Sequence, residues 1–174
     1  QEVLRAAHRA RDLVKQILAF GRQGEEGRKP IQLEHTIREV TKFMRASLPA
    51  TIEIRQHLEP DLDDVLADPV QIHQVVMNLC TNAGHAMQEG GGVLEIRLAQ
   101  LGAFPESALR PPGLKPGPCL RLTVRDSGHG MDPATLEKIF DPYFTTKEKG
   151  VGTGLGLSVV HGIVQSHGGQ ITVE

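Results

Sequence analysis

The stretch Val151-Gly152-Thr153-Gly154-Leu155-Gly156-Leu157 decides which fold we expect for this chain. Its glycines alternate with other residues, which is typical of a backbone that approaches another group closely or takes a positive φ. The apolar residues that follow recur at helical spacing, so the stretch is predicted to open a helix. Free N–H groups and the dipole at the start of a helix attract anions. The stretch therefore predicts an anion-binding loop.

A second glycine motif, Asp126-Ser127-Gly128-His129-Gly130, follows a predicted strand over 120–126. Glycines at this point allow a flat ligand to lie against the backbone. The carboxylate of Asp126 can accept a hydrogen bond from an exocyclic amine such as that of adenine. A simple Asx turn after the strand is the alternative interpretation, and the motif taken alone favours it.

Asn78 and Asn82 lie four residues apart on a predicted helix over 69–88, so they share one helix face. Amide carbonyl oxygens can bind Mg²⁺ while the metal keeps water and phosphate ligands. The alternative interpretation is a solvated face with two exposed amides. Together with the two glycine motifs, however, this helix indicates a site for the phosphates of a nucleotide.

Composition limits the remaining possibilities. The chain has 174 residues, of which 39% are hydrophobic, which is enough for a compact core. Its net charge of -2 offers no broad electrostatic surface for nucleic acid. Its two cysteines indicate a reducing compartment, and Cys80 is expected to pack as a small apolar residue. Because the chain starts within a predicted helix, we expect a fragment whose parent protein could be membrane-anchored upstream.

The predicted elements mix helices with neighbouring strand pairs. We therefore expect an α+β fold, a two-layer α/β sandwich in which helices cover one face of a mixed sheet. On the helix over 69–88, six residues are expected to pack on that sheet: Ile72, Val75, Val76, Leu79, Ala83 and Ala86. The other expected elements are helices over 1–20, 36–47 and after 156, strands near 52–55, 65–67, 93–96, 120–126 and 171–173, and a surface loop over 101–118.

Four motifs resemble the sequence boxes of sensor histidine kinases, and they occur in the same order and spacing. Residues 74–83 (QVVMNLCTNA) are similar to the N box, and residues 126–131 (DSGHGM) to the G1 box. Residues 139–147 (IFDPYFTTK) are similar to the F box, and residues 152–157 to the G2 box. The resemblance covers about residues 28–174 and implies the Bergerat ATP-binding fold of gyrase, Hsp90 and MutL-type ATPases, the GHKL type.

Residues 1–22 resemble the second helix of the dimerisation and phosphoacceptor hairpin of these kinases. The resemblance thus divides the chain into a partial hairpin helix with its linker over 1–27 and an ATP-binding catalytic domain over 28–174. That domain is expected to stop before its last strand. The whole is most similar to the catalytic half of nitrogen-regulator-like and hybrid sensor kinases.

The resemblance also implies roles for particular residues. Asn82 would hold Mg²⁺ with Asn78 beside it, and these two would be the catalytic residues. Asp126 would recognise adenine, the glycine run would wrap the triphosphate, and 132–151 would form an ATP lid. The family often has a basic or an acidic residue at the position of His85, so its role stays open. The residues expected to contact ATP are Asn78, Asn82, His85, Asp126, Gly128, Gly130, Met131, Phe140, Phe144, Lys147, Gly152, Thr153, Gly154, Leu155, Gly156 and Leu157, of which Phe140 and Phe144 would anchor the lid.

The activity implied by the resemblance is transfer of the ATP γ-phosphate to a histidine in two-component signalling. His8 has no neighbouring carboxylate to orient its imidazole, so the acceptor histidine is expected upstream of Gln1. The implied partners are ATP, the receiver domain of a response regulator and a second copy of the chain, which would bind through the hairpin. No nucleic acid partner is expected. The expected location is the cytoplasm. Two alternatives stay open: another ATPase or serine kinase of this fold, or a domain that binds ATP without transferring phosphate.

Overall fold

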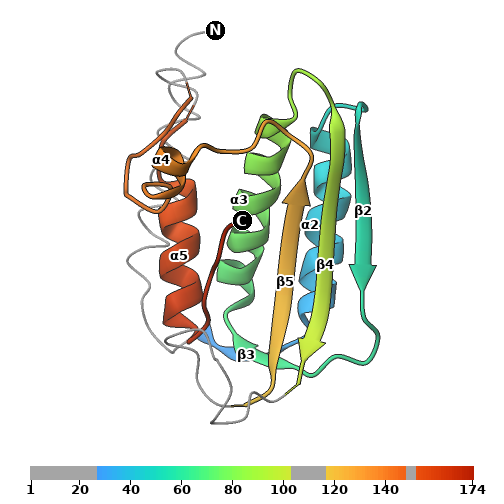
Figure 1. The fold of residues 1–174 in the computed structure, drawn as a ribbon. Helices are drawn as coiled ribbons and strands as arrows, with labels where there is room; N and C mark the ends of the chain where they lie inside the picture. Colours follow the sequence, from blue (N-terminus) through green and yellow to red (C-terminus); the bar gives the residue numbers. More distant parts are fainter. Residues whose placement is uncertain (1–26, 103–116, 148–151) are drawn as a thin grey trace, which may run out of the picture.

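The computed structural model describes residues 27–102, 117–147 and 152–174 (Figure 1). The predicted helix over 1–20 and most of the predicted loop over 101–118 lie outside these residues. The elements, in chain order, are β1 (Lys29–Ile31), α2 (Leu33–Ser47), β2 (Ile52–Leu58), β3 (Val65–Ala67), α3 (Pro69–Ala86), β4 (Gly92–Leu101), β5 (Cys119–Asp126), α4 (Pro133–Leu136) and α5 (Gly156–Ser166).

Three strands form a mixed sheet in the order β2-β4-β5, in which β2 runs parallel and β5 antiparallel to the central β4. The register pairs Ile54 with Leu94 and Ile96 with Val124, so apolar side chains from all three strands share one face. The short strands β1 and β3 pair antiparallel in a separate ladder. The mixed sheet is the layer against which the helices pack.

Helices α2 and α3 cover the apolar face of the sheet, and α5 lies on the other flank of α3 (Figure 1). The prediction of two layers is therefore confirmed. The prediction that Val75 and Leu79 face the sheet is wrong, because α3 has a second apolar stripe. Val75 is buried there with Val160 of α5, and Leu79 packs against the same cluster. The main core contains Ile37, Val40, Met44, Ile52, Val76, Cys80, Ala83, Met87, Leu94, Ile96 and Leu98.

Helix α3 begins where the sequence predicts. Asp68 is its N-cap, with a side-chain oxygen that accepts from the N–H of Val70 at 2.8 Å, and Pro69 occupies the first turn. The helix ends at Ala86, slightly before the predicted end at 88. Cys80 is fully buried in the main core, so it packs as the small apolar side chain that we expected. This burial raises the pKa of its thiol to about 12.

Two predicted boundaries are wrong. Residues 171–173 do not form a strand, because among the described residues the ladders of the mixed sheet contain only β2, β4 and β5. Ile171 instead packs, half-buried, against the cluster between α3 and α5. Helix α2 begins at Leu33 rather than at 36, and Glu34 in its first turn forms an ion pair at 2.8 Å with Arg38, one turn further along.

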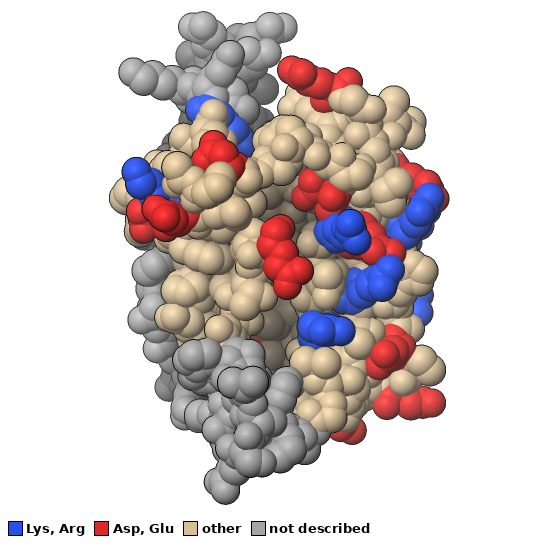
Figure 2. All heavy atoms as spheres, viewed as in Figure 1, with Lys and Arg blue, Asp and Glu red and all other residues tan. Residues whose placement is uncertain are grey.

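The face of the sheet away from the helices is covered by charged side chains of both signs (Figure 2). The hydrogen bond from Arg55 holds the pKa of Glu53 below its ordinary value, and Arg97 has the same effect on Glu95. Such exposed pairs within a strand mark a solvated surface and contribute little to stability. None of the described helices has both the length and the apolar character that a bilayer span requires.

Candidate functional site

Asn78 and Asn82 occupy successive turns on one face of α3, and the first residue of α5 lies opposite them. A Cβ atom added to Gly156 would lie 3.6 Å from Asn78 Oδ1 and 3.7 Å from Asn82 Nδ2. The Nδ2 atom of Asn78 is buried and has no hydrogen-bond partner among the described residues. A buried amide donor without an acceptor costs roughly 1–3 kcal/mol, which is typical of a position prepared for another group.

The start of α5 adds backbone donors to this place. The first intrahelical bond of α5 runs from the N–H of Val159 to the carbonyl of Leu155. The N–H of Leu155 itself donates to Thr153 Oγ1 at 3.4 Å. The N–H groups of a first helical turn have no intrahelical acceptor and favour anions. Because this turn begins at Gly156, its donors lie beside the two asparagines of α3.

The other two glycines of the run are close to the segment 143–147. Gly154 has φ +66°, and a Cβ there would collide with the backbone of Tyr143. The N–H of Tyr143 donates to the carbonyl of Gly154 at 2.9 Å. A Cβ on Gly152 would lie 3.2 Å from both Cβ and Cδ of Lys147. The run is therefore held between α3 on one side and the segment 143–147 on the other.

Asp126 ends β5 on the side of the sheet that faces the helices, since it shares the alternation of Leu122 and Val124. Its Oδ1 atom accepts from the N–H of Gly128 at 2.9 Å, so the Asx turn considered as the alternative is present. The other carboxylate oxygen of this exposed residue forms no hydrogen bond within the described residues. The turn thus uses one oxygen and leaves the second available to a ligand.

The residues after Asp126 are attached to the end of α3. A Cβ on Gly128 would lie 2.6 Å from the carbonyl oxygen of Ala86, and the N–H of His129 donates to that oxygen at 3.4 Å. Gly130 has φ +67°, in the left-handed region that favours glycine. Met131 is exposed. The second glycine motif is therefore placed beside the helix that carries Asn78 and Asn82.

The proposed lid is attached to α5 through an aromatic contact. Phe140 stacks on the ring of His161 with centroids 4.9 Å apart, and Ile139 beside it is buried. Phe144 is half-buried. Sequence reasoning missed His161, although its place near the middle of the helix after the glycine run could have indicated a lid contact.

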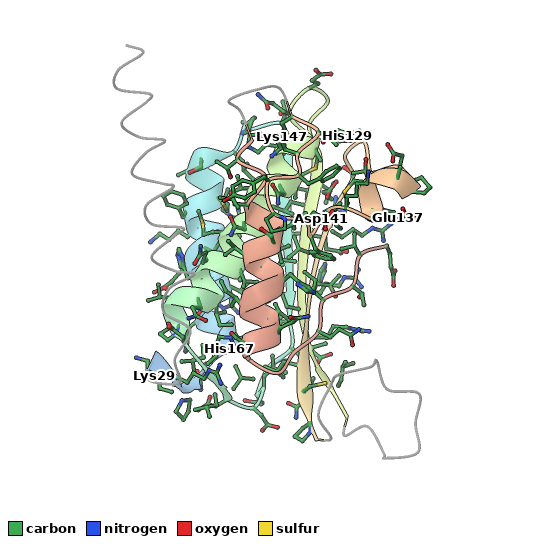
Figure 3. All side chains as sticks on the ribbon, turned by 90° about the vertical axis from the view of Figure 1, so that its left-hand side faces the viewer. Lys29, His129, Glu137, Asp141, Lys147 and His167 are labelled. Atoms are coloured by element: carbon green, nitrogen blue, oxygen red, sulfur yellow. The ribbon has the colours of Figure 1, made fainter. Side chains whose placement is uncertain are left out.

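His85, Asn82 and Lys147 meet at the same end of α3, where Figure 3 also places His129. The ammonium of Lys147 donates to Asn82 Oδ1 at 3.4 Å. Burial and the positive charge of Lys147 lower the pKa of His85, whereas a hydrogen bond with Gln88 raises it. Burial also lowers the pKa of Lys147. Both shifts follow mainly from burial, and no carboxylate pairs with Lys147 among the described residues.

The structure brings together most of the residues that the sequence singled out. Asn78, Asn82, His85, Lys147 and Gly156 form one group, which we call the α3–α5 site. The motif from Asp126 to Gly130 adjoins the same end of α3. Leu155 and Leu157 are half-buried beside the run, whereas Met131 and Phe140 have no contact with this group among the bonds and ring contacts described.

Comparison with known proteins agrees with this geometry. Residues 67–174 match the family described as "Histidine kinase-, DNA gyrase B-, and HSP90-like ATPase", and the chain belongs to this family. The α+β sandwich is therefore the GHKL ATPase fold that the sequence resemblance implied. Sensor kinase CckA of Brucella abortus is 38% identical over 165 residues, which is 95% of this chain and 17% of that protein. The chain thus spans only a small part of the length of this relative.

Solved structures show the same architecture. Histidine kinase ThkA in complex with the response regulator TrrA superposes with a TM-score of 0.63 at 25% identity, covering 94% of this chain and 42% of that chain. Full-length ShkA in complex with AMPPNP gives a TM-score of 0.61 at 27% identity, covering 89% of this chain and 30% of that one. The described fold is thus that of a histidine kinase catalytic domain.

Proposed function

We propose that this chain binds ATP together with Mg²⁺ at the α3–α5 site and supplies the catalytic half of a protein-histidine kinase. The observation that carries the proposal is the side-chain amide of Asn78, whose buried Nδ2 has no hydrogen-bond partner among the described residues and whose Oδ1 lies nearest the first residue of α5. An amide donor and backbone N–H groups that converge on one place form a cradle for phosphate oxygens. The match to ATPases and the AMPPNP complex of ShkA support the same ligand.

The donor set also fits a magnesium ion. Among the described residues no three His, Cys, Asp or Glu side chains gather as metal ligands, so an ion here would rely on amide and phosphate oxygens. Asn82 Oδ1 already accepts a hydrogen bond from a cationic group, the ammonium of Lys147. Asn82 would hold the ion with Asn78 beside it, and the ion would neutralise phosphate charge during transfer.

At the adenine end, the second carboxylate oxygen of Asp126 would accept from the exocyclic amine while Gly128 and Gly130 leave room for the base. Gly152, Thr153, Gly154, Leu155 and Leu157 would line the triphosphate path through the backbone, and Met131, Phe140 and Phe144 would border the lid.

The reaction that these residues support is phosphoryl transfer to a histidine nitrogen. The imidazole is the nucleophile, and the chain's own contribution is to position the γ-phosphate and neutralise its charge. We propose that the acceptor histidine belongs to a dimerisation hairpin, of which residues 1–27 are a part and residues 28–174 the catalytic domain. By analogy with ThkA and TrrA, the partner that receives the phosphate is a response regulator. We further propose that the protein forms a homodimer through this hairpin and acts in the cytoplasm.

The proposal is tested by calorimetric titration with ADP, with and without Mg²⁺. Asn82→Ala should leave ADP binding in EDTA nearly unchanged and remove most of the affinity that Mg²⁺ adds. Thr81→Ala, an exposed neighbour on the same helix, is the matched control and should keep the increment. A Mg²⁺ increment that survives in Asn82→Ala would show that Asn82 is not the ligand.

Transfer is tested separately with γ-labelled ATP. The chain alone should acquire no acid-labile label, because His8 lacks the orienting carboxylate. A hairpin peptide with an acceptor histidine, supplied in trans, should become labelled. Label on His8 would move the acceptor into this chain, and nucleotide binding without any transfer would favour a domain that only binds ATP.

A further inference from the structure

Lys147 makes a contact that phosphate binding alone does not explain. Its ammonium lies 3.4 Å from Oδ1 of Asn82, a residue that precedes it by 65 positions. That oxygen is the atom through which an asparagine binds a metal ion. A charged side chain of the chain itself thus occupies the metal-binding atom of the α3–α5 site.

The route of the Lys147 side chain depends on a glycine. Gly152 has no backbone angle that requires glycine, yet a Cβ there would lie 3.2 Å from both Cβ and Cδ of Lys147 and against Thr145 Oγ1. The Lys147 N–H donates to the same Thr145 Oγ1 at 3.2 Å, which fixes the start of the side chain. The path of the Lys147 side chain to Asn82 is therefore constrained by Gly152 and Thr145.

The contact contains a positive charge but no negative one among the described residues. Lys147 is half-buried, and no carboxylate pairs with it among the described residues. Its hydrogen bond to a neutral amide compensates burial of the charge less well than a carboxylate would. The ammonium is thus held where it gains from the arrival of phosphate oxygens, and where a second cation would be repelled.

We propose that Lys147 and Mg²⁺ are alternative cations at Asn82 Oδ1, so that Lys147 sets how strongly nucleotide binding depends on Mg²⁺. The inference rests on the proposed function and adds a step to it. When Mg²⁺ enters with the nucleotide, the ammonium leaves Asn82 and pairs with a phosphate oxygen. In the absence of Mg²⁺ the ammonium stays at Asn82 and serves as the cation of the site.

The test compares the affinity for ADP in EDTA with the affinity at saturating Mg²⁺, measured by calorimetry. The ratio of the two dissociation constants is the Mg²⁺ increment. Lys147→Met removes the competing cation, so ADP should bind more weakly in EDTA and the increment should rise about fivefold, the size of coupling usual for groups in contact. Lys138→Met, an exposed lysine earlier in the same segment, is the control and should leave the increment unchanged. Lys147→Arg keeps the charge and should keep the increment near that of the parent chain.

The inference would be overturned by a Mg²⁺ increment that is unchanged or smaller in Lys147→Met, provided that a thermal unfolding transition shows the variant to be folded. That result leaves the proposed function intact if Asn82→Ala still abolishes the increment. If the parent chain shows no nucleotide binding, or no Mg²⁺ increment, the proposed function itself fails. The two failures are therefore distinguishable from the same titrations.

Discussion

His167 and Asp68 join the two helices of the site at the end far from Asn82 and Lys147 (Figure 3). The N–H of Asp68 donates to His167 Nε2 at 3.1 Å, across 99 residues of sequence. His167 Nδ1 lies 2.8 Å from the carbonyl oxygen of Ile163, which can only accept, so Nδ1 carries the proton and Nε2 is the acceptor. The bond connects the N-cap of α3 to the C-cap of α5, at the opposite end of the helices from Lys147 (Figure 3).

Replacement of His167 by phenylalanine should destabilise the chain. The half-buried N–H of Asp68 would lose its acceptor, at a cost of about 1–2 kcal/mol in the free energy of unfolding. Urea denaturation followed by circular dichroism measures this change. His73→Phe, at an exposed position of α3, is the matched control and should change stability by less than about 0.5 kcal/mol. Equal stability of the two variants would show that the bond is energetically unimportant.

Asp126→Asn should weaken adenine nucleotides more than guanine nucleotides. Asparagine keeps an Oδ1 atom that can accept from the N–H of Gly128, so the turn survives. The second carboxylate oxygen, however, becomes an amide that donates, and it can no longer accept from the adenine amine. The loss should be about 1.5–3 kcal/mol for ADP. Calorimetry with ADP and GDP measures the difference, with Asp64→Asn as the distant control, and equal losses for both nucleotides would contradict the assignment of Asp126.

The parts of the fold that could be predicted from sequence are those fixed by local chemistry. Asp68 and Pro69 define the start of α3 whatever packs around it, so that boundary is correct. Residues 171–173 alternate like a strand, but alternation does not supply a pairing partner. Similarly, Val75 lies on a helical apolar stripe, and only the packed structure decides that the stripe faces α5 rather than the sheet.

The same division holds for the site. The motifs predicted a helix and two turns that the structure does bring together, because glycine, aspartate and asparagine have local backbone and hydrogen-bonding preferences. Their binding roles stay a prediction. The contact between Lys147 and Asn82 depends on how a distant segment folds back onto α3, and no spacing in the sequence encodes it. At Asp126 the Asx turn that local sequence favours is present and uses one carboxylate oxygen, so the turn does not prevent the binding role that we propose for the other.

Tyr143 should report nucleotide binding through its fluorescence. It is the only tyrosine and the chain has no tryptophan, so the signal comes from this residue alone. Its backbone N–H donates to the carbonyl of Gly154, whereas the residue as a whole is 75% exposed. A nucleotide that orders the lid should raise the tyrosine anisotropy. The signal should vanish in Tyr143→Phe, and an anisotropy that stays constant at a saturating ATP analogue would show that the lid segment does not respond.

The pH dependence of stability should contain a contribution from His85. Burial and Lys147 lower the pKa of His85 in the folded chain, so the unfolded chain binds the proton more readily. The free energy of unfolding should therefore fall as the pH drops through the ordinary histidine value of about 6.5. His85→Gln should reduce the loss of stability between about pH 7.5 and pH 5.5, whereas His73→Gln, at an exposed position, should not.

Lys147→Met should raise the pKa of His85 measured by NMR titration, because it removes the nearby positive charge. A pKa of His85 that is insensitive to this substitution would show that the two side chains are not neighbours in solution.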